Sequence, residues 1–121
     1  MTARNLFDVE FYLNTYSDVA ASGVDPFTHY SLFGWREDRD PSAFFSTRFY
    51  KTVNADIKTA DINPLVHYVD FGVQELRDPS PFFDTSIYLS DNPDVANGAT
   101  NPLEHFIAFG NEELRRANEL F

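Results

Sequence analysis

Apolar residues occur in short clusters separated by polar turns, and the most regular cluster follows an Asp-Pro or Asn-Pro pair. An Asp or Asn side chain accepts hydrogen bonds from the free amides of a first helical turn, and proline fits that turn. Apolar residues then continue at helical spacing until a glycine. The pattern predicts three helices with an N-cap and a terminal glycine, at Asp25 and Gly34, Asn63 and Gly72, and Asn101 and Gly110.

Each of these helices is expected to have one apolar face that packs into the core. The spacing of three residues along the helix places large apolar side chains on the same side. The faces are Phe27, Tyr30 and Phe33, then Leu65, Tyr68 and Phe71, then Leu103, Phe106 and Phe109.

Two further helices are predicted before each of them. The first, of about two to three turns, starts at a capping residue that follows a phenylalanine, namely Asp8, Ser46 or Asp84. The second is short, with the length of a single 3₁₀ turn as an alternative. Asn92 before Pro93 has the residue types of an N-cap followed by a proline at the first helical position.

The whole pattern repeats every 38 residues without a gap, as Phe7, Phe45 and Phe83 show. We therefore divide the chain into unit 1 (6–43), unit 2 (44–81) and unit 3 (82–119). A unit of this size cannot bury its aromatic face alone, so neighbouring units are expected to stack. The sequence predicts one all-α domain, 1–121, built as a short solenoid or a compact bundle of three tandem helical repeats.

Charge and composition exclude several classes of function. A formal net charge of -10 disfavours nucleic acid and anionic membrane surfaces as partners, whereas it is compatible with calcium. Cysteine is absent, which removes disulfides and thiolate metal sites. The sequence has no apolar stretch long enough to span a bilayer, and its first residues, MTARNLFDVEF, do not resemble a signal peptide.

Three sets of polar residues recur once in each unit. The histidines are His29, His67 and His105, the aspartates are Asp18, Asp56 and Asp94, and the arginines are Arg39, Arg77 and Arg115. Packed helices lie about 8–10 Å apart, which is too far for histidines of adjacent units to share a metal ion. We therefore expect the histidines to bond between units or to cap backbone, with a ligand-binding or pH-sensing role as the alternative. Arginine binds carboxylate in a bidentate fork, so each arginine is expected to hold its polar connection against its own unit.

A glycosidase needs two carboxylates at a defined separation, and the acidic residues of this chain are candidates for such a pair. They repeat with the unit, whereas catalysis needs one asymmetric set of groups in different environments. The sequence also contains no GxSxG, HExxH, EF-hand, phosphate-binding glycine loop or RTX nonapeptide motif. We therefore expect no enzymatic activity and no catalytic or metal-ligating residue.

Trp35 stands where the other units have Val73 and Asn111. An exposed tryptophan often marks a binding surface, including sugar-stacking platforms, although packing against the next unit is the favoured interpretation. Trp35 with Arg36 and Tyr16 forms the candidate binding surface.

The unit resembles a bacterial tandem repeat of the form YLxxNPDVAxAGxNPLxHYxxxGxxEGRxPS, which unit 3 matches in YLSDNPDVANGATNPLEHFIAFGNEELR. The resemblance implies an accessory helical repeat of large secreted or surface proteins, found beside RTX-type calcium repeats or glycosyltransferases. The glycine of the EGR motif is replaced here by Asp38, Leu76 and Leu114. If that glycine has a positive φ, these residues must be strained or the chain must turn differently.

These observations lead to one expected function and two alternatives. The first is a non-enzymatic module for protein interaction or spacing in a secreted or surface-associated bacterial protein, with self-association as a further possibility. The alternatives are a carbohydrate-binding module that recognises a polysaccharide and a calcium-stabilised extracellular domain.

Overall fold

The computed structural model describes residues 3–98, 100–110 and 117, and these residues form helices and turns with no strand. The α-helices are α1 (Val9–Thr15), α2 (Ser17–Ser22), α3 (Pro26–Leu32), α4 (Thr47–Val53), α5 (Ala55–Ala60), α6 (Pro64–His67), α7 (Thr85–Asp91), α8 (Pro93–Ala96) and α9 (Pro102–His105). Two 3₁₀ segments, η1 (Ala3–Leu6) and η2 (Gly34–Glu37), and two π segments, η3 (Tyr68–Gly72) and η4 (Phe106–Gly110), accompany them. The all-α prediction is confirmed.

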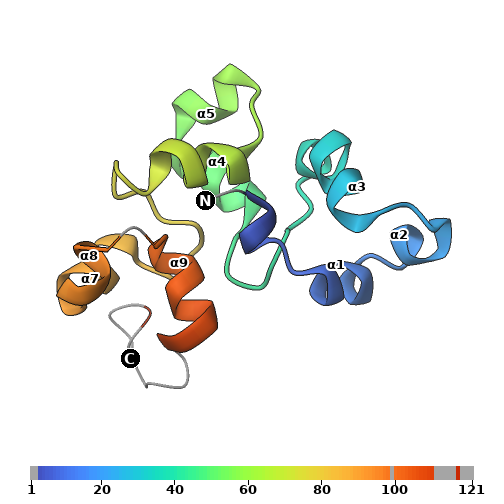
Figure 1. Ribbon diagram of the computed structural model, residues 1–121. Coiled ribbons are helices and arrows are strands. Elements are labelled where there is room, and N and C mark those ends of the chain that lie inside the picture. Colours follow the sequence, from blue (N-terminus) through green and yellow to red (C-terminus); the bar gives the residue numbers. More distant parts are fainter. Residues whose placement is uncertain (1–2, 99, 111–116, 118–121) are drawn as a thin grey trace.

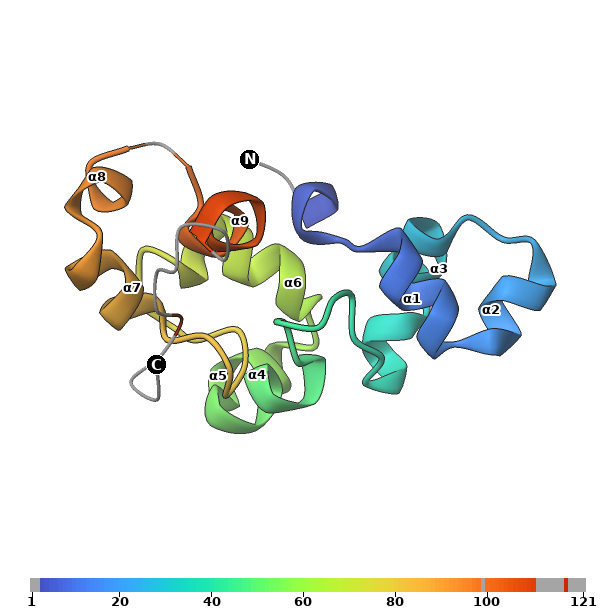
Figure 2. The same ribbon diagram turned by 90° about the horizontal axis from the view of Figure 1, so that it is seen from below.

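The helices are arranged in groups of three along the molecule. In Figures 1 and 2, α1–α3 lie at one end, α4–α6 in the middle and α7–α9 at the other end. The N-terminal segment η1 does not continue this order, because it lies against α9. Each group corresponds to one of the sequence units.

The predicted helix caps are present at the first helix of each group. The side chains of Asp8, Ser46 and Asp84 accept hydrogen bonds from the backbone amides of Phe11, Phe49 and Ile87. The third helices begin in the same way, since Asp25, Asn63 and Asn101 each accept from amides of the first turn. These side chains replace the bonds that the first helical amides lack within the helix.

Asn92 is the exception among the predicted caps. It occupies the N-cap position of α8, but its side chain makes no cap hydrogen bond. Its Nδ2 instead donates to the carbonyl oxygen of Tyr88 at 2.8 Å, as Asn54 does to that of Tyr50 at 2.9 Å. Asn92 therefore joins two consecutive helices at their corner.

The third helix does not end in a left-handed glycine. Gly34 and Gly72 have no positive φ, and the chain continues in helical turns as η2 begins and as η3 ends. A Cβ at Gly34 would overlap the Tyr12 hydroxyl, and one at Gly72 would overlap the Tyr50 hydroxyl. These glycines are therefore required by close packing and not by the turn.

The left-handed turn comes four residues later, at the positions where the resembling repeats have glycine. Asp38 has a φ of 60° and Leu76 a φ of 58°. The strained alternative is thus the one observed, because a residue with a Cβ is disfavoured there by about 1–2 kcal/mol. Leu114 lies outside the described residues.

The largest side chains of the core are tyrosine and phenylalanine rings. The fully buried rings are Tyr12, Tyr30, Tyr50, Tyr68, Tyr88, Phe45 and Phe83. The predicted apolar faces are only partly inside, because Phe33, Phe71 and Phe109 are 55%, 59% and 56% exposed. The third residue of each predicted face therefore lies at the surface, beyond the reach of the neighbouring helices.

Each unit closes on itself through one backbone bond. The amide of Asp8 donates to the carbonyl of Pro41 at 2.9 Å, and the amide of Ser46 to that of Pro79 at 2.9 Å. In unit 3 the amide of Asp84 donates to Ala117 at 2.7 Å. The start and end of every unit are thereby held together.

Adjacent units meet at a buried threonine. Thr47 Oγ1 donates to the carbonyl of Arg39 at 2.7 Å and lies 2.9 Å from the Tyr30 hydroxyl, while its amide donates to Asp40. Thr85 makes the same three contacts with Arg77, Tyr68 and Asp78. We call these two contact regions joint 1 (units 1 and 2) and joint 2 (units 2 and 3).

Candidate functional site

Each unit contains one hydrogen bond between the tyrosine of its first helix and the histidine of its third. The bonded pairs are Tyr12 with His29, Tyr50 with His67, and Tyr88 with His105, each with 2.8 Å between the hydroxyl oxygen and Nδ1. The expectation that these histidines bond between units or cap backbone is wrong. They fasten the first and third helices of one unit, beside the glycine that lets the tyrosine approach.

The arginine of each described pair is held as the sequence predicted. Arg77 donates to both carboxylate oxygens of Asp56, at 2.9 and 2.8 Å, and its Nε lies 2.9 Å from Glu75. Arg39 binds Asp18 at 2.8 and 2.7 Å and Glu37 at 2.9 Å. Arg115, the expected partner of Asp94, lies outside the described residues.

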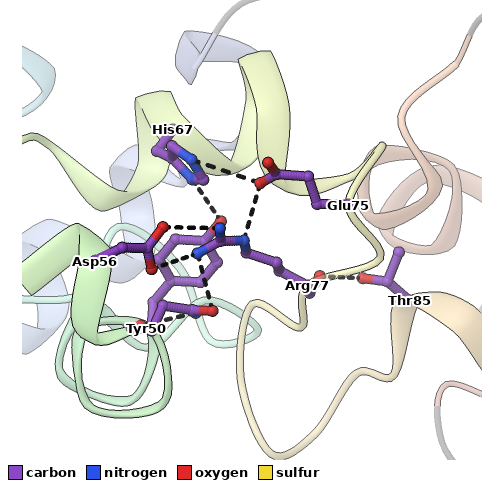
Figure 3. Close-up of polar contacts among 7 residues, drawn as sticks. Tyr50, Asp56, His67, Glu75, Arg77 and Thr85 are labelled. Carbon is purple, nitrogen blue, oxygen red and sulfur yellow. Dashed lines mark hydrogen bonds and ion pairs between the residues drawn. The ribbon is translucent and has the colours of Figure 1, made fainter.

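Figure 3 shows how these two sets join in unit 2. His67 Nε2 lies 3.7 Å from the Glu75 carboxylate that also faces Arg77. Arg77 also donates to the side chain of Asn54 at 3.1 Å. The network thus connects the three helices of the unit to the polar turn that leads to joint 2.

The surroundings fix the protonation of this network near neutral pH. Hydrogen bonds from Arg39 lower the pKa of Asp18 to about 2, and those from Arg77 lower the pKa of Asp56. Burial lowers the pKa of His67 and raises that of Tyr50, which favours their neutral forms. His67 is 9% exposed, and both of its ring nitrogens face protein groups. This arrangement is suited to holding the unit together.

Trp35 is packed, in agreement with the favoured interpretation of the sequence. Its side chain is 6% exposed, and Nε1 donates to the carbonyl of Ser31 at 3.1 Å. The Arg36 guanidinium lies 4.3 Å from the indole and binds Asp61 at 3.1 and 2.9 Å. The indole therefore offers no open face for stacking on a sugar.

Tyr16 belongs to a different environment from Trp35 and Arg36. It is half-buried under the Arg39 guanidinium, which lies 4.9 Å from its ring, and its hydroxyl accepts from the amide of Asp40 at 2.7 Å. The structure therefore joins two of the three residues of the predicted binding surface and assigns the third to the interior network of unit 1.

Trp35 lines one of the surface grooves that the sequence did not predict, and a second groove lies at the equivalent place in the next pair of units. Groove 1 runs along joint 1 and is lined by Trp35, Arg36, Lys51, Ile57, Lys58 and Asp61. Groove 2 runs along joint 2 and is lined by Val73, Gln74, Leu76, Leu89, Val95 and Ala96. The 38-residue interval relates the two, since Trp35 corresponds to Val73, Lys51 to Leu89 and Ile57 to Val95. They are the same groove with different side chains.

An exposed phenylalanine at the same position of each unit is another surface feature that sequence reasoning missed. The ring of Phe33 lies 5.8 Å from that of His29, Phe71 lies 5.7 Å from His67, and Phe109 lies 5.5 Å from His105. Each ring is more than half exposed. In the sequence, these phenylalanines recur one turn after the histidine of each unit. Core residues recur in the same way, so recurrence alone does not show that a position is exposed.

The described residues lack two other kinds of functional feature. They contain no group of three or more His, Cys, Asp or Glu side chains arranged to hold a metal ion. None of their helices has the length and apolar character needed to cross a membrane.

No protein-family model, curated protein or solved structure matches this chain. The interpretation of its surface therefore depends on its own geometry.

Proposed function

We propose that the chain is a three-unit helical repeat that acts as a non-enzymatic protein-interaction or spacing module in a secreted or surface-associated bacterial protein. In this arrangement the units stack as a short solenoid, with the joints as their contacts. The bacterial setting follows from the resemblance of the repeat motif.

The exposure of Phe33, Phe71 and Phe109, one at the same position of each unit, is the observation that carries this proposal. Burying an aromatic side chain contributes roughly 1.5–3 kcal/mol to stability, so a domain gains nothing for its own fold by leaving three at equivalent surface positions. Exposed apolar side chains are typical of protein interfaces where they gather on one surface. One exposed phenylalanine per unit suits a partner that contacts several units at once.

The polar residues support a structural role for the unit interior. The arginine forks, the tyrosine and histidine pairs and the joint threonines bond with one another within the protein. Their bonds hold helices together and do not converge on an open cavity. The recurring surface is therefore apolar, while the recurring polar groups lie underneath it.

The test is a triple variant, Phe33→Ser, Phe71→Ser and Phe109→Ser, compared with the wild type in capture of bacterial surface and secreted proteins. A matched control changes Val9, Val53 and Leu32 to serine, since these residues are exposed but do not recur. We expect loss of partners only in the phenylalanine variant, with both variants folded by circular dichroism. Equal capture by all three proteins would contradict the proposal.

A further inference from the structure

We propose that groove 2 is a docking site for an aromatic side chain on a cationic segment of a partner protein. This inference rests on the proposed function, because it names one contact that an interaction module would make. It comes from comparing the two grooves position by position.

Groove 1 is filled by a side chain of its own unit. The Trp35 indole is buried there, and the Arg36 guanidinium lies over it, held by Asp61. At joint 2 the equivalents of these three residues are Val73, Gln74 and Ala99, none of which carries a ring or a charge. Among the described residues, groove 2 therefore has no counterpart of the aromatic filling or of the ion pair that closes groove 1.

The residues along the walls of the two grooves also differ in charge. In groove 1, Lys51 forms an ion pair with Asp38 and Lys58 lines the surface. In groove 2 the corresponding residues are Leu89, Leu76 and Ala96. Charges are thus replaced by aliphatic side chains, which are the environment that an aromatic ring prefers.

Groove 2 is also the larger of the two, and it extends further, to Val69, Gly98, Asn101 and Pro102. Groove 1 has a volume of about 230 Å³ and groove 2 of about 500 Å³. The larger value is within the range of about 300–1,000 Å³ found for ligand sites. An aromatic side chain is the group that fills the same location at joint 1, so it is the group whose shape the backbone accommodates at joint 2.

Leu76, which lines groove 2, has a strained backbone conformation. It has a φ of 58° and is nevertheless 52% exposed. A glycine would adopt this φ without strain. The leucine side chain adds little stability in return, because about half of it is exposed to solvent. A partner that covers groove 2 would give the side chain an apolar contact.

The charge of the occupant follows from electrostatic complementarity. The described residues that line groove 2 include no lysine, arginine or histidine, and the chain has a formal net charge of -10. Asp70, next to the lining residue Val69, is exposed. A partner segment with lysine or arginine beside its aromatic residue would be attracted to this surface.

The test uses the amidated tripeptide Lys-Trp-Lys, titrated into the ¹⁵N-labelled chain and followed by NMR. We expect saturable shifts at Val73, Leu76, Leu89 and Val95 with a Kd of about 1 mM or tighter, the affinity that one anchored aromatic side chain supports. Lys-Ala-Lys amide is the matched control and should produce no saturable shift there. Equal responses to both peptides, or shifts elsewhere on the chain, would overturn the proposal.

Two variants test the groove from the protein side. Val73→Trp copies joint 1 and should fill the groove, and Leu89→Lys copies Lys51 and should place a cation in it. Both are expected to weaken binding at least tenfold while thermal melting shows a folded chain, and unchanged binding in a folded variant would contradict docking in groove 2. If Val73→Trp does not fold, Leu89→Lys provides the test.

The phenylalanine variant separates this inference from the proposed function. Phe33→Ser, Phe71→Ser and Phe109→Ser together should leave Lys-Trp-Lys binding unchanged. Absence of peptide binding alongside phenylalanine-dependent capture of partners would refute the groove proposal alone. Peptide binding without phenylalanine-dependent capture would refute Phe33, Phe71 and Phe109 as the interaction surface and leave the groove proposal standing.

Discussion

Joint 1 and joint 2 are built on the same interior and differ at their surface. Thr47 and Thr85 make identical sets of hydrogen bonds to a tyrosine, an aspartate and a carbonyl of the preceding unit. At the surface, groove 1 is filled by Trp35 and bordered by ion pairs, whereas groove 2 has the aliphatic residues Val73, Leu76 and Leu89 at the equivalent positions. The contrast indicates that the buried hydrogen bonds connect adjacent units, while the outer groove is free to differ.

The ends of the chain support this division. Val9 stands at the position of the joint threonines, and Phe106 at that of Tyr30 and Tyr68. Within the described residues Val9 is 50% exposed at the first unit, and Phe106 is buried against Phe44 and Phe83. In the described residues, the paired hydroxyl groups of a threonine and a tyrosine therefore occur at joint 1 and joint 2.

Replacing the groove filling should have the largest effect. Trp35→Val is expected to lower the free energy of unfolding by about 2–4 kcal/mol, because it removes a buried ring and leaves a cavity. The reciprocal change Val73→Trp should raise it, since the open groove receives the ring. Urea denaturation of both variants measures the change in the free energy of unfolding. If Trp35→Val leaves it unchanged, the side chain that fills groove 1 does not stabilise the chain and the two grooves do not differ in this respect.

The joint threonines should come next, with equal effects at the two joints. Thr47→Val and Thr85→Val are each expected to cost about 1–3 kcal/mol, because a buried tyrosine hydroxyl and a carbonyl lose their partner. Adding Tyr30→Phe to Thr47→Val should cost less than the sum of the single changes, since both hydroxyls are then absent. Chemical denaturation tests this, and clearly unequal costs at the two joints would show that their interiors are not equivalent.

The left-handed turn should distinguish the joints by the size of the gain that a glycine gives. Leu76→Gly is expected to stabilise the chain by about 1 kcal/mol, because it relieves the positive φ. Asp38→Gly relieves the same strain but loses the contact with Lys51, so its net effect should be close to zero. Melting temperatures of the two variants provide the comparison, and a gain at Asp38 as large as that at Leu76 would mean that the Lys51 ion pair contributes nothing.

The smallest effect is expected at the ion pair over Trp35. Arg36→Gln copies the residue of joint 2 and should lower stability by about 1 kcal/mol or less, because the side chains of Arg36 and Asp61 are 55% and 68% exposed. The difference from the wild type should shrink further in high salt. A loss as large as that of Trp35→Val would show that the pair is part of the core.

The sequence predicted the parts of the fold that depend on local chemistry. Helix caps such as Asp8 and Asn63 depend on residues within the next turn, and the fork between Arg39 and Asp18 follows from repeated charges of opposite sign. The exterior position of Phe33 was missed, because spacing along a helix does not show how far the neighbouring helices extend. The two grooves were missed for a related reason, since each combines side chains from two units.

The glycines show a different limit of sequence reasoning. Gly34 was interpreted as a helix terminator, but its small size is needed by the Tyr12 hydroxyl, which comes from another helix. A tertiary contact of this kind leaves the same sequence signal as a left-handed cap. Only the positive φ at Asp38 and Leu76 shows where the turn lies.

The backbone bond that closes each unit has a consequence for the rate of folding. The contacts between Asp8 and Pro41, Tyr12 and His29, and Arg39 and Asp18 all connect residues of a single unit. Folding is fast when contacting residues are near each other in sequence, because the entropy of loop closure is small. Contacts within a unit can therefore form early, whereas its aromatic core is completed only when a neighbouring unit docks onto it.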